Sequence, residues 1–207
     1  MKLYYFDVYG RAEAIRILLD YAKVEYEDVR TKQEEWGEIK KTGKFEYGCM
    51  PALEKDGKMY SMSGAILRYV AVANGLYPTD PEEVYEVEKL LDLVGDYTAG
   101  LIKLHFTKDE DEKKKMFGEY LENFFPKYLG YFDKQLQSNS SKEFMVGDKA
   151  TAVDFQMLHL LERIVNTDIL KEPVGAILDT FPTLKGYYET RYEAQKAYFE
   201  GRPVCPY

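Results

Sequence analysis

The sequence predicts an α/β domain at the N-terminus and an all-α domain at the C-terminus. Three observations support this fold class. Strand-like and helix-like stretches alternate over residues 1–75, a turn-rich stretch with two prolines follows at residues 76–81, and apolar residues then recur at helical spacing. We therefore expect domains at residues 1–75 and 81–207, joined by a linker at residues 76–80.

The first elements of the α/β half have separate signals. Aromatic and β-branched residues indicate strands at Lys2–Phe6 and Tyr26–Val29. Between them, Ile15, Leu18 and Leu19 recur at helical spacing, so a helix is expected from about Gly10 onward. Residues 31–48 are polar and ambiguous, and we expect an irregular helix and a loop there.

The α/β half is expected to end with a hairpin and a helix. Asp56-Gly57 is a typical two-residue hairpin turn, and it joins predicted strands at residues 52–55 and 58–60. Ser63 stands at the N-cap position of the helix that follows, and Asn74-Gly75 ends that helix.

The helical half begins with a long helix from Pro81, because proline is well tolerated at a first helical position. A second long helix carries the aromatic residues between positions 117 and 132, with a kink at Pro126. The mixed-charge run at residues 108–115 is expected to be a solvated segment between the two helices. Thr151 and Asp154 fit a capping box at the start of a later helix.

Composition argues against several classes of function. The formal net charge is -8, which disfavours binding to nucleic acid or to an anionic membrane. No apolar run approaches the roughly 20 residues that a membrane span needs, and the N-terminus lacks a signal-peptide pattern, so we expect a cytoplasmic protein. Cys49 with Cys205, and His105 with His159, form neither a disulfide framework nor a metal-ligand spacing, and no metal is expected.

The segment from Tyr5 to Glu13 brings a hydroxyl, a guanidinium and a helix start together. Tyr5 lies at the end of the first predicted strand, and Arg11 lies where the next helix begins. Such a combination suits an anion. A core aromatic residue is the alternative for Tyr5, because the chain has 19 tyrosines. Spacing alone leaves both interpretations open.

Several spaced motifs resemble the tyrosine-type cytosolic glutathione transferases. They are Tyr5-Phe6, Gly10-Arg11-Ala12-Glu13, Trp36, Lys40, Met50-Pro51-Ala52-Leu53-Glu54, Asp56-Gly57, Ser63, Pro126-Lys127-Tyr128-Leu129 and the 147–154 cap. The resemblance covers nearly the whole chain and is most similar to the sigma class, with mu and pi next. It implies a thioredoxin-like N-terminal domain, an all-helical C-terminal domain, glutathione as co-substrate, a homodimer and a function in detoxification.

The resemblance also implies roles for individual residues. Tyr5 matches the catalytic tyrosine, whose hydroxyl donates a hydrogen bond to the glutathione sulfur and favours the thiolate. Arg11 adds positive potential nearby. Met50, joined to Pro51 by a cis bond, is expected to pair its backbone with the cysteinyl part of glutathione. The other implied glutathione contacts are Ser63 at the γ-glutamyl carboxylate, Trp36 and Lys40 at the glycine end, and Asp96 at the α-amino group across the dimer.

Four of these roles have structural alternatives that the sequence leaves open. The alternative for Arg11 is a surface arginine, and the alternative for Pro51 is a proline that opens an edge strand. Ser63 reads as a simple helix cap. Asp96 reads as an exposed aspartate on a solvated helix.

The sequence departs from the family pattern beside Ser63 and along the first long helix. Met62 stands where the family usually has a glutamine, which removes one polar contact to the γ-glutamyl group. Asp92 and Asp96 flank Gly95, so the acidic cluster that can bind magnesium in the prostaglandin D synthase branch is incomplete.

A second-substrate pocket is expected to take small hydrophobic electrophiles. Its expected lining is Phe6, Val8, Tyr9, Tyr97, Leu101 and Leu104, with Val204 and Tyr207 of the tail, and helical core packing is the alternative for most of them. The leading functional hypothesis is conjugation of the glutathione thiolate to such electrophiles. The alternatives are a glutathione-dependent isomerase of the prostaglandin D synthase type and a non-catalytic, crystallin-like binding or structural protein.

Overall fold

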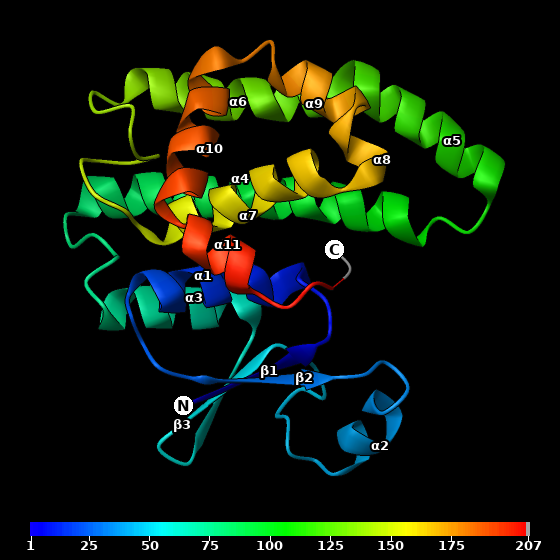
Figure 1. Ribbon diagram of the computed structural model, residues 1–207, viewed down its shortest axis with the longest axis vertical. Helices are drawn as coiled ribbons and strands as arrows, with labels where there is room; N and C mark the ends of the chain where they lie inside the picture. The colour runs from blue at the N-terminus through cyan, green and yellow to red at the C-terminus, as the bar shows by residue number, and fades with distance from the viewer. Residues whose placement is uncertain (206–207) are drawn as a thin grey trace. The chain divides into compact units, whose positions relative to one another are not determined.

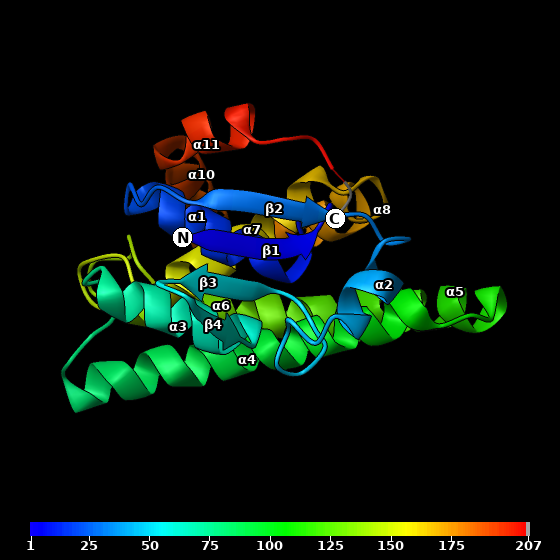
Figure 2. The same cartoon turned by 90° about the horizontal axis from the view of Figure 1, so that it is seen from below.

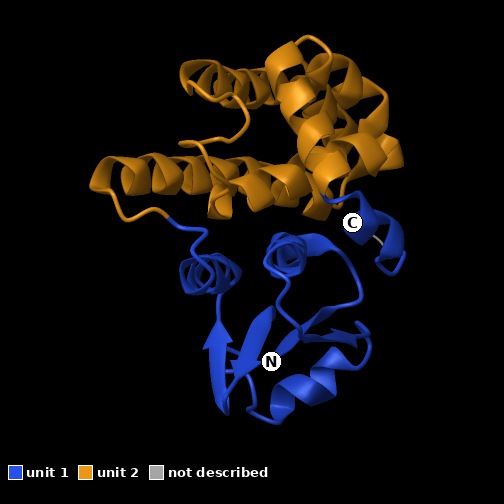
Figure 3. Ribbon diagram, turned by 60° about the vertical axis from the view of Figure 1, so that its left-hand side comes forward, with its two compact units in different colours: residues 1–77, 195–207 blue, residues 78–194 orange. Residues whose placement is uncertain are grey.

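Two compact units make up the described part of the chain, residues 1–205 of the computed structural model (Figures 1 and 3). The first unit combines residues 1–77 with the C-terminal residues from Gln195 onward, and the second contains residues 78–194. The first unit is α/β and the second is all-helical, which confirms the predicted fold class. The sequence assigns residues 81–207 to one helical domain, and this assignment stays a prediction; by its contacts, the segment from Gln195 to Cys205 groups with the first unit. Apolar spacing shows that a segment is helical, but not which unit it packs against.

A four-stranded sheet forms the centre of the first unit (Figure 2). Its strands are β1 (Lys2–Phe6), β2 (Glu27–Thr31), β3 (Ala52–Lys55) and β4 (Lys58–Ser61), in the order β2-β1-β3-β4. β1 pairs in parallel with β2 and antiparallel with β3, and β3 and β4 form the predicted hairpin. The second strand starts and ends slightly later than the sequence indicated.

Helices cover both faces of this sheet. The helical elements of the first unit are η1 (Gly10–Ala12), α1 (Glu13–Tyr21), α2 (Trp36–Lys41), α3 (Ser63–Ala73) and α11 (Lys196–Gly201). α1 and α3 lie on one side of the sheet and α2 on the other (Figure 1). Leu3, Leu53, Ile17 and Leu18 are fully buried between the sheet and these helices. The predicted helix after Gly10 therefore starts as a short 3-10 turn and continues as α1.

The second unit begins with the predicted long helix. It contains α4 (Pro81–Phe106), α5 (Glu110–Glu119), η2 (Tyr120–Phe124), α6 (Phe125–Ser138), α7 (Ala152–Asn166), α8 (Asp168–Lys171), α9 (Pro173–Leu178) and α10 (Pro182–Ala194). The Asp80 carboxylate caps α4 by accepting the backbone N–H groups of Glu82 and Glu83 at 3.0 and 3.1 Å. Proline at N1 and an aspartate cap explain why this helix start could be read from the sequence. None of the helices within residues 1–205 is long and apolar enough to cross a membrane.

The region between α4 and α6 differs from the prediction. Residues 108–115 are exposed for the most part, but most of them are helical, because Asp109 caps α5 by accepting the N–H of Glu112 at 2.8 Å. The aromatic run lies in one continuous helical stretch, as predicted, and the kink at Pro126 stays a prediction. A π-helical turn, η2, lies between α5 and α6 within this stretch, and Pro126 lies in the first turn of α6.

The capping box at the start of α7 is confirmed. The buried Asp154 carboxylate accepts the backbone N–H of Thr151 at 2.8 Å, and its other oxygen accepts the N–H of Met145 at 2.8 Å. The hydroxyl of Tyr187 adds a further hydrogen bond at 2.9 Å. This cluster is a folding element of the helical unit, as the sequence analysis expected.

Candidate active site

Tyr5 lies at the end of β1, with its hydroxyl against the first turn of the helical segment that follows. Its side chain is buried, and its Oη accepts the backbone N–H of Arg11 at 3.1 Å. Within residues 1–205, no side chain or carbonyl accepts the Tyr5 hydroxyl proton. Because the oxygen already accepts a hydrogen bond from one direction, the proton is free to point toward a ligand.

Gly10 makes this close approach possible. It has a φ of +42°, in the left-handed region that glycine adopts without penalty. A Cβ at this position would lie 2.8 Å from Tyr5 Oη and 2.9 Å from Tyr5 Cε1. Glycine is therefore required here both by the backbone conformation and by the proximity of the tyrosine.

Arg11 approaches Tyr5 through its backbone. The predicted contribution was a positive guanidinium, but the side chain is exposed and the observed contact is the N–H on Tyr5 Oη. The N–H groups at a helix start carry a partial positive charge, and Arg11 lies in such a start, η1. The role of the guanidinium stays a prediction.

Two buried charges behind Tyr5 were not identified from the sequence. Arg16 and Glu13 are 1% and 0% exposed, and Arg16 Nη1 lies 3.1 Å from Glu13 Oε2. The same nitrogen donates to the carbonyl oxygens of Val8 and Tyr9 at 3.1 and 3.2 Å. Arg16 thereby fixes the backbone that leads from β1 to Gly10. The only signal in the sequence was a charged residue within the apolar run of α1.

The peptide bond between Met50 and Pro51 is cis, which confirms the expectation from the resemblance. Pro51 immediately precedes β3, whose Ala52 pairs with Tyr4 of β1. Tyr5 and the Met50-Pro51 peptide therefore lie next to each other, just beyond the last residue pair of β1 and β3. Met50 is largely buried, and its pairing with a ligand backbone stays a prediction.

The loop before Met50 is attached to the sheet by a small polar cluster. Lys44 Nζ donates to Tyr4 Oη at 2.7 Å and lies 3.1 Å from the Glu54 carboxylate, and Tyr4 donates to Glu54 at 2.7 Å. The hydrogen bond from Tyr4, followed by that from Lys44, holds the pKa of Glu54 below its usual value. The cluster positions the loop relative to β1 and β3.

The start of α3 lies one residue earlier than the sequence predicts. Ser63 is the first residue of α3, and Met62 occupies the cap position with φ 71° and ψ 111° and no side-chain cap bond. This conformation is rare for a residue with a Cβ and costs on the order of 1–3 kcal/mol. The first N–H groups of α3 have no partner within the helix, so this terminus can receive a carboxylate. Met62 itself is 56% exposed.

Trp36 is linked to Tyr5 by aromatic contacts. The ring of Phe6 lies 5.5 Å from that of Tyr5 and 5.7 Å from that of Trp36, between ring centroids. Lys40 is exposed on the same helix, α2, and its side chain runs beside Gly48, where a Cβ would lie 2.9 Å from Lys40 Cε. The structure therefore brings Tyr5, Phe6 and Trp36 together, with Lys40 on the neighbouring turn.

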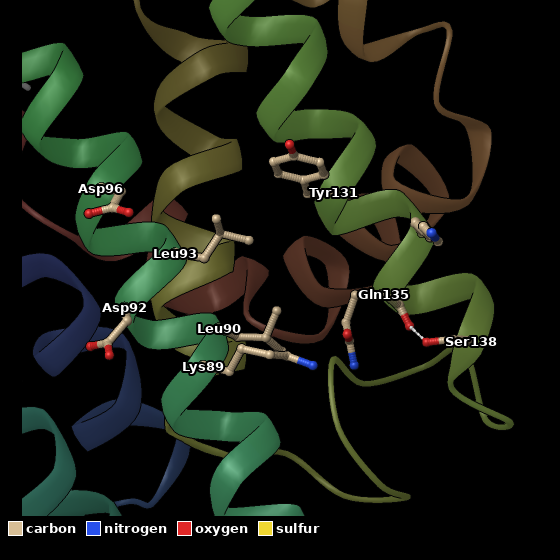
Figure 4. A pocket seen from close by; sticks show the side chains of 9 residues that line it. Lys89, Leu90, Asp92, Leu93, Asp96, Tyr131, Gln135 and Ser138 are labelled. Atoms are coloured by element: carbon tan, nitrogen blue, oxygen red, sulfur yellow. Dashed lines mark hydrogen bonds between the residues drawn. The ribbon is translucent and has the colours of Figure 1, made fainter.

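The remaining predicted site residues belong to the helical unit. Asp96 is exposed on α4 and, with Asp92, lines a groove between α4 and α6 (Figure 4). Within residues 1–205, no three His, Cys, Asp or Glu side chains are grouped to hold a metal ion. Both interpretations of Asp96 require an exposed side chain, so its role across a dimer stays a prediction.

Tyr97 is a core residue of the helical unit. It is 1% exposed, and its ring packs against those of Phe124 and Tyr128 at 5.3 and 5.6 Å. This packing favours the core alternative for Tyr97, and Leu101 and Leu104 of the same helix are also buried.

The predicted pocket residues of the first unit differ in their surroundings. Tyr9 is buried beneath the guanidinium of Arg202, 3.9 Å above its ring. Phe6 and Val8 are half-buried, Val204 is exposed and Tyr207 lies outside the described residues. A pocket shared by these residues and those of α4 stays a prediction.

Comparison with known proteins identifies the family. Residues 1–72 match the glutathione S-transferase N-terminal domain, and residues 95–199 match the glutathione S-transferase C-terminal domain. The chain belongs to the glutathione S-transferase family. A probable glutathione S-transferase 7 of Caenorhabditis elegans is 32% identical over 213 residues, which cover 100% of this chain and 98% of the relative.

Two further relatives bear on function and assembly. A hematopoietic prostaglandin D synthase of Gallus gallus is 36% identical over 154 residues, 74% of each chain. The crystal structure of monomeric Na-GST-3, a glutathione S-transferase of the hookworm Necator americanus, is 29% identical with a TM-score of 0.87, covering 100% of this chain and 98% of that one. The family assignment made from the motifs is therefore confirmed, and the sigma class stays a prediction.

Proposed function

We propose that this glutathione transferase activates the sulfur of glutathione with the hydroxyl of Tyr5 and transfers it to small hydrophobic electrophiles. The observation that carries the proposal is the hydrogen bond from Arg11 N–H to Tyr5 Oη, which occupies the oxygen and leaves the proton for the ligand. Transferase activity as such follows from the named relatives. The assignment of the chemistry to Tyr5 is ours.

The proposed chemistry begins with the glutathione thiol. A free thiol has a pKa of about 8.5 and is mostly protonated at neutral pH. A hydrogen bond donated to the sulfur favours the thiolate, and a decrease of ~2 pKa units corresponds to ~2.7 kcal/mol of preferential stabilisation. The thiol proton leaves to solvent. The thiolate then attacks the electrophilic carbon, so that a carbon–sulfur bond forms and any leaving group departs with its electron pair.

Glutathione is proposed to lie along the end of the sheet in an extended conformation. Its cysteinyl part pairs with the backbone of Met50, and its γ-glutamyl carboxylate binds at the start of α3 beside Ser63. Its glycine end reaches Trp36 and Lys40 on α2. Met62 supplies an apolar thioether at the γ-glutamyl end, where an amide side chain would donate a hydrogen bond. We therefore expect recognition at this end to depend on the backbone of α3.

The test compares Tyr5→Phe with Tyr85→Phe, which removes the hydroxyl of a tyrosine that is 61% exposed on α4. We expect Tyr5→Phe to lower kcat for an aryl halide by roughly ten- to a hundredfold near neutral pH, because up to ~2.7 kcal/mol of thiolate stabilisation is lost. The KM for glutathione should change little, since the peptide contacts remain. The proposal is wrong if Tyr5→Phe is as fast as Tyr85→Phe and titrates its bound thiol at the same pH.

A second candidate function is isomerisation of the prostaglandin D synthase type. The relative of Gallus gallus that carries this name supports it. Isomerisation also begins with a glutathione thiolate, so Tyr5 would have the same role. Product analysis with the endoperoxide substrate, alongside a conjugation assay with an aryl halide, separates the two activities. A crystallin-like binding protein would bind to immobilised glutathione but turn over neither substrate.

We propose a homodimer of the sigma class located in the cytoplasm. The resemblance of the motifs supports all three statements, and the exposed Asp96 on α4 is available for a contact with a second copy. Because one relative is described as monomeric, the number of chains in the assembly needs to be measured. Light scattering that gives the mass of a single chain at working concentration would exclude the role of Asp96 across a dimer.

A further inference from the structure

The C-terminal segment from Gln195 to Cys205 packs against the helix and loop that follow β1. It belongs to the first unit, and α11 lies beside α1 (Figures 1 and 2). Gln195 Nε2 donates to the carbonyl of Ile17 in α1 at 3.1 Å, and the side chain of Gln195 is buried. The two partners are separated by 178 positions in the sequence. The end of the chain therefore contributes to the structure immediately behind Tyr5.

Glu13 is the centre of these contacts. Its Oε1 accepts the hydroxyl of Tyr198 at 2.9 Å and Nη1 of Arg202 at 2.6 Å, and its Oε2 accepts Nη1 of Arg16 at 3.1 Å. Burial, followed by the nearby Glu13 charge, raises the pKa of Tyr198 far above its usual value, so this hydroxyl stays protonated and acts as the donor. A carboxylate with no exposed surface is stable only when its oxygens are fully occupied in this way.

The network continues from Glu13 to the loop before Gly10. Arg16 Nη1 is shared between Glu13 and the carbonyl oxygens of Val8 and Tyr9. Arg202 also covers the ring of Tyr9, with its guanidinium carbon 3.9 Å from the ring centroid. The loop is thus held at both its carbonyl groups and its aromatic side chain.

Arg202 determines which acceptors the Arg16 guanidinium can bind. A single guanidinium nitrogen carries two hydrogens, and Arg16 Nη1 faces three acceptors at 3.1–3.2 Å. Because Arg202 and Tyr198 occupy Oε1 of Glu13, Arg16 needs to serve only the other oxygen and can also bind the two carbonyls. Without Arg202, Glu13 would lose one of its two observed arginine partners, and Arg16 would be drawn toward Glu13 and away from the loop.

We propose that the C-terminal segment, through Arg202 and Tyr198 on Glu13, is a positioning element for Tyr5. It fixes the loop at residues 8–11 so that the N–H of Arg11 stays on Tyr5 Oη and the tyrosine proton stays directed at the ligand sulfur. The inference rests on the proposed role of Tyr5. The proposed glutathione contacts come from α2, α3 and the segment before β3, which are not part of this network.

The experiment uses the full-length protein with three variants of the network and one control. Arg202→Gln removes the charge, Arg202→Lys retains it, and Tyr198→Phe removes one hydrogen bond while keeping the ring. Glu200→Gln is the control, because Glu200 is exposed on the same helix, α11. Circular dichroism and thermal unfolding establish that each variant is folded. The readouts are kcat, the KM for glutathione, and the pKa of the bound thiol from thiolate absorbance.

We expect Arg202→Gln to raise the pKa of the bound thiol by up to ~1 unit and to lower kcat by up to ~tenfold near neutral pH, the size expected for weakening one hydrogen bond. Arg202→Lys should recover a large part of this loss. Tyr198→Phe should give a smaller change in the same direction, about twofold to threefold. The KM for glutathione should stay within about twofold of wild type, and Glu200→Gln should match wild type in every readout.

The outcomes separate this inference from the role of Tyr5. If wild type and Tyr5→Phe titrate the bound thiol at the same pH, the role of Tyr5 itself is wrong. If wild type shows a lowered thiol pKa but folded Arg202→Gln and Tyr198→Phe retain it, only the positioning role is overturned. A rise in the KM for glutathione at unchanged kcat would likewise overturn it, because the segment would then support binding. If Arg202→Gln does not fold, Tyr198→Phe decides.

Discussion

Replacement of Gly10 by alanine tests the geometry around Tyr5 most directly. The new Cβ would lie 2.8 Å from Tyr5 Oη, 2.9 Å from Cε1 and 3.3 Å from Cζ, so the tyrosine ring or the loop must shift. The ring is only 8% exposed and is flanked by Phe6 and by the Arg16 guanidinium, which limits its movement. A shift of the hydroxyl away from Arg11 N–H therefore follows.

The expected magnitude has two parts. Alanine in the left-handed region at φ +42° costs roughly 1–2 kcal/mol, and overpacking typically adds 1–3 kcal/mol. We expect the free energy of unfolding to fall by about 2–5 kcal/mol. Because the hydroxyl is displaced from the sulfur, kcat should fall by about as much as in Tyr5→Phe, roughly ten- to a hundredfold.

The assay pairs Gly10→Ala with Gly57→Ala. Gly57 has a φ of +75°, but a Cβ there would meet no atom within 4 Å, so this control carries the backbone cost without the clash. Denaturant unfolding and conjugation rates are measured for both. The Gly10→Ala change should also have little further effect on kcat in a Tyr5→Phe background, since both act through one hydroxyl. Equal stability and equal rates for the two alanine variants would refute the reasoning.

Two further predictions concern the buried polar groups. Burial raises the pKa of Tyr26, Tyr97, Tyr187 and Tyr198, so the folded chain holds these protons more tightly than the unfolded chain. The stability that these groups contribute should be present below about pH 10 and be lost as the pH rises further. In a pH titration, the last tyrosinate absorbance should appear together with the loss of the circular dichroism signal. Complete formation of tyrosinate while the chain is still folded would contradict this. Asp154→Asn should lower the free energy of unfolding by about 2–5 kcal/mol, because an amide has one acceptor oxygen, whereas the two carboxylate oxygens of Asp154 each accept a backbone N–H. Asp148→Asn, at an exposed position, should change the free energy of unfolding little. Similar denaturation midpoints for the two variants would show that the cluster is unimportant.

Local patterns explain most of what the sequence predicted correctly. The strand at Lys2–Phe6, the Asp56-Gly57 hairpin and the start of α4 at Pro81 each depend on a few adjacent residues with a fixed conformational preference. The cis bond before Pro51 came from the family resemblance, because proline alone does not determine the isomer. The candidate residues around Tyr5 were likewise found through the motif that contains them.

The incorrect predictions depend on information that adjacent residues do not contain. A π-helical turn at Tyr120–Phe124 has no composition that separates it from an α-helix, so the sequence predicts only a helix at these residues. Met62 adopts a conformation that its side chain disfavours, and the sequence therefore placed the cap at Ser63. The pairing of Glu13 with Arg202 spans 189 positions and cannot be read from spacing.

The buried charges behind Tyr5 are best explained by orientation. Desolvating Glu13, Arg16 and Arg202 costs several kcal/mol per ion, and apolar residues of similar volume would often be at least as stabilising. An apolar cluster would fill the same space but could not bind the carbonyls of Val8 and Tyr9. Only a fixed donor sets the direction of the loop that places Arg11 N–H on Tyr5 Oη. The buried charges therefore set the angle and distance of the hydrogen bond between Arg11 N–H and Tyr5 Oη, which apolar packing alone would not determine.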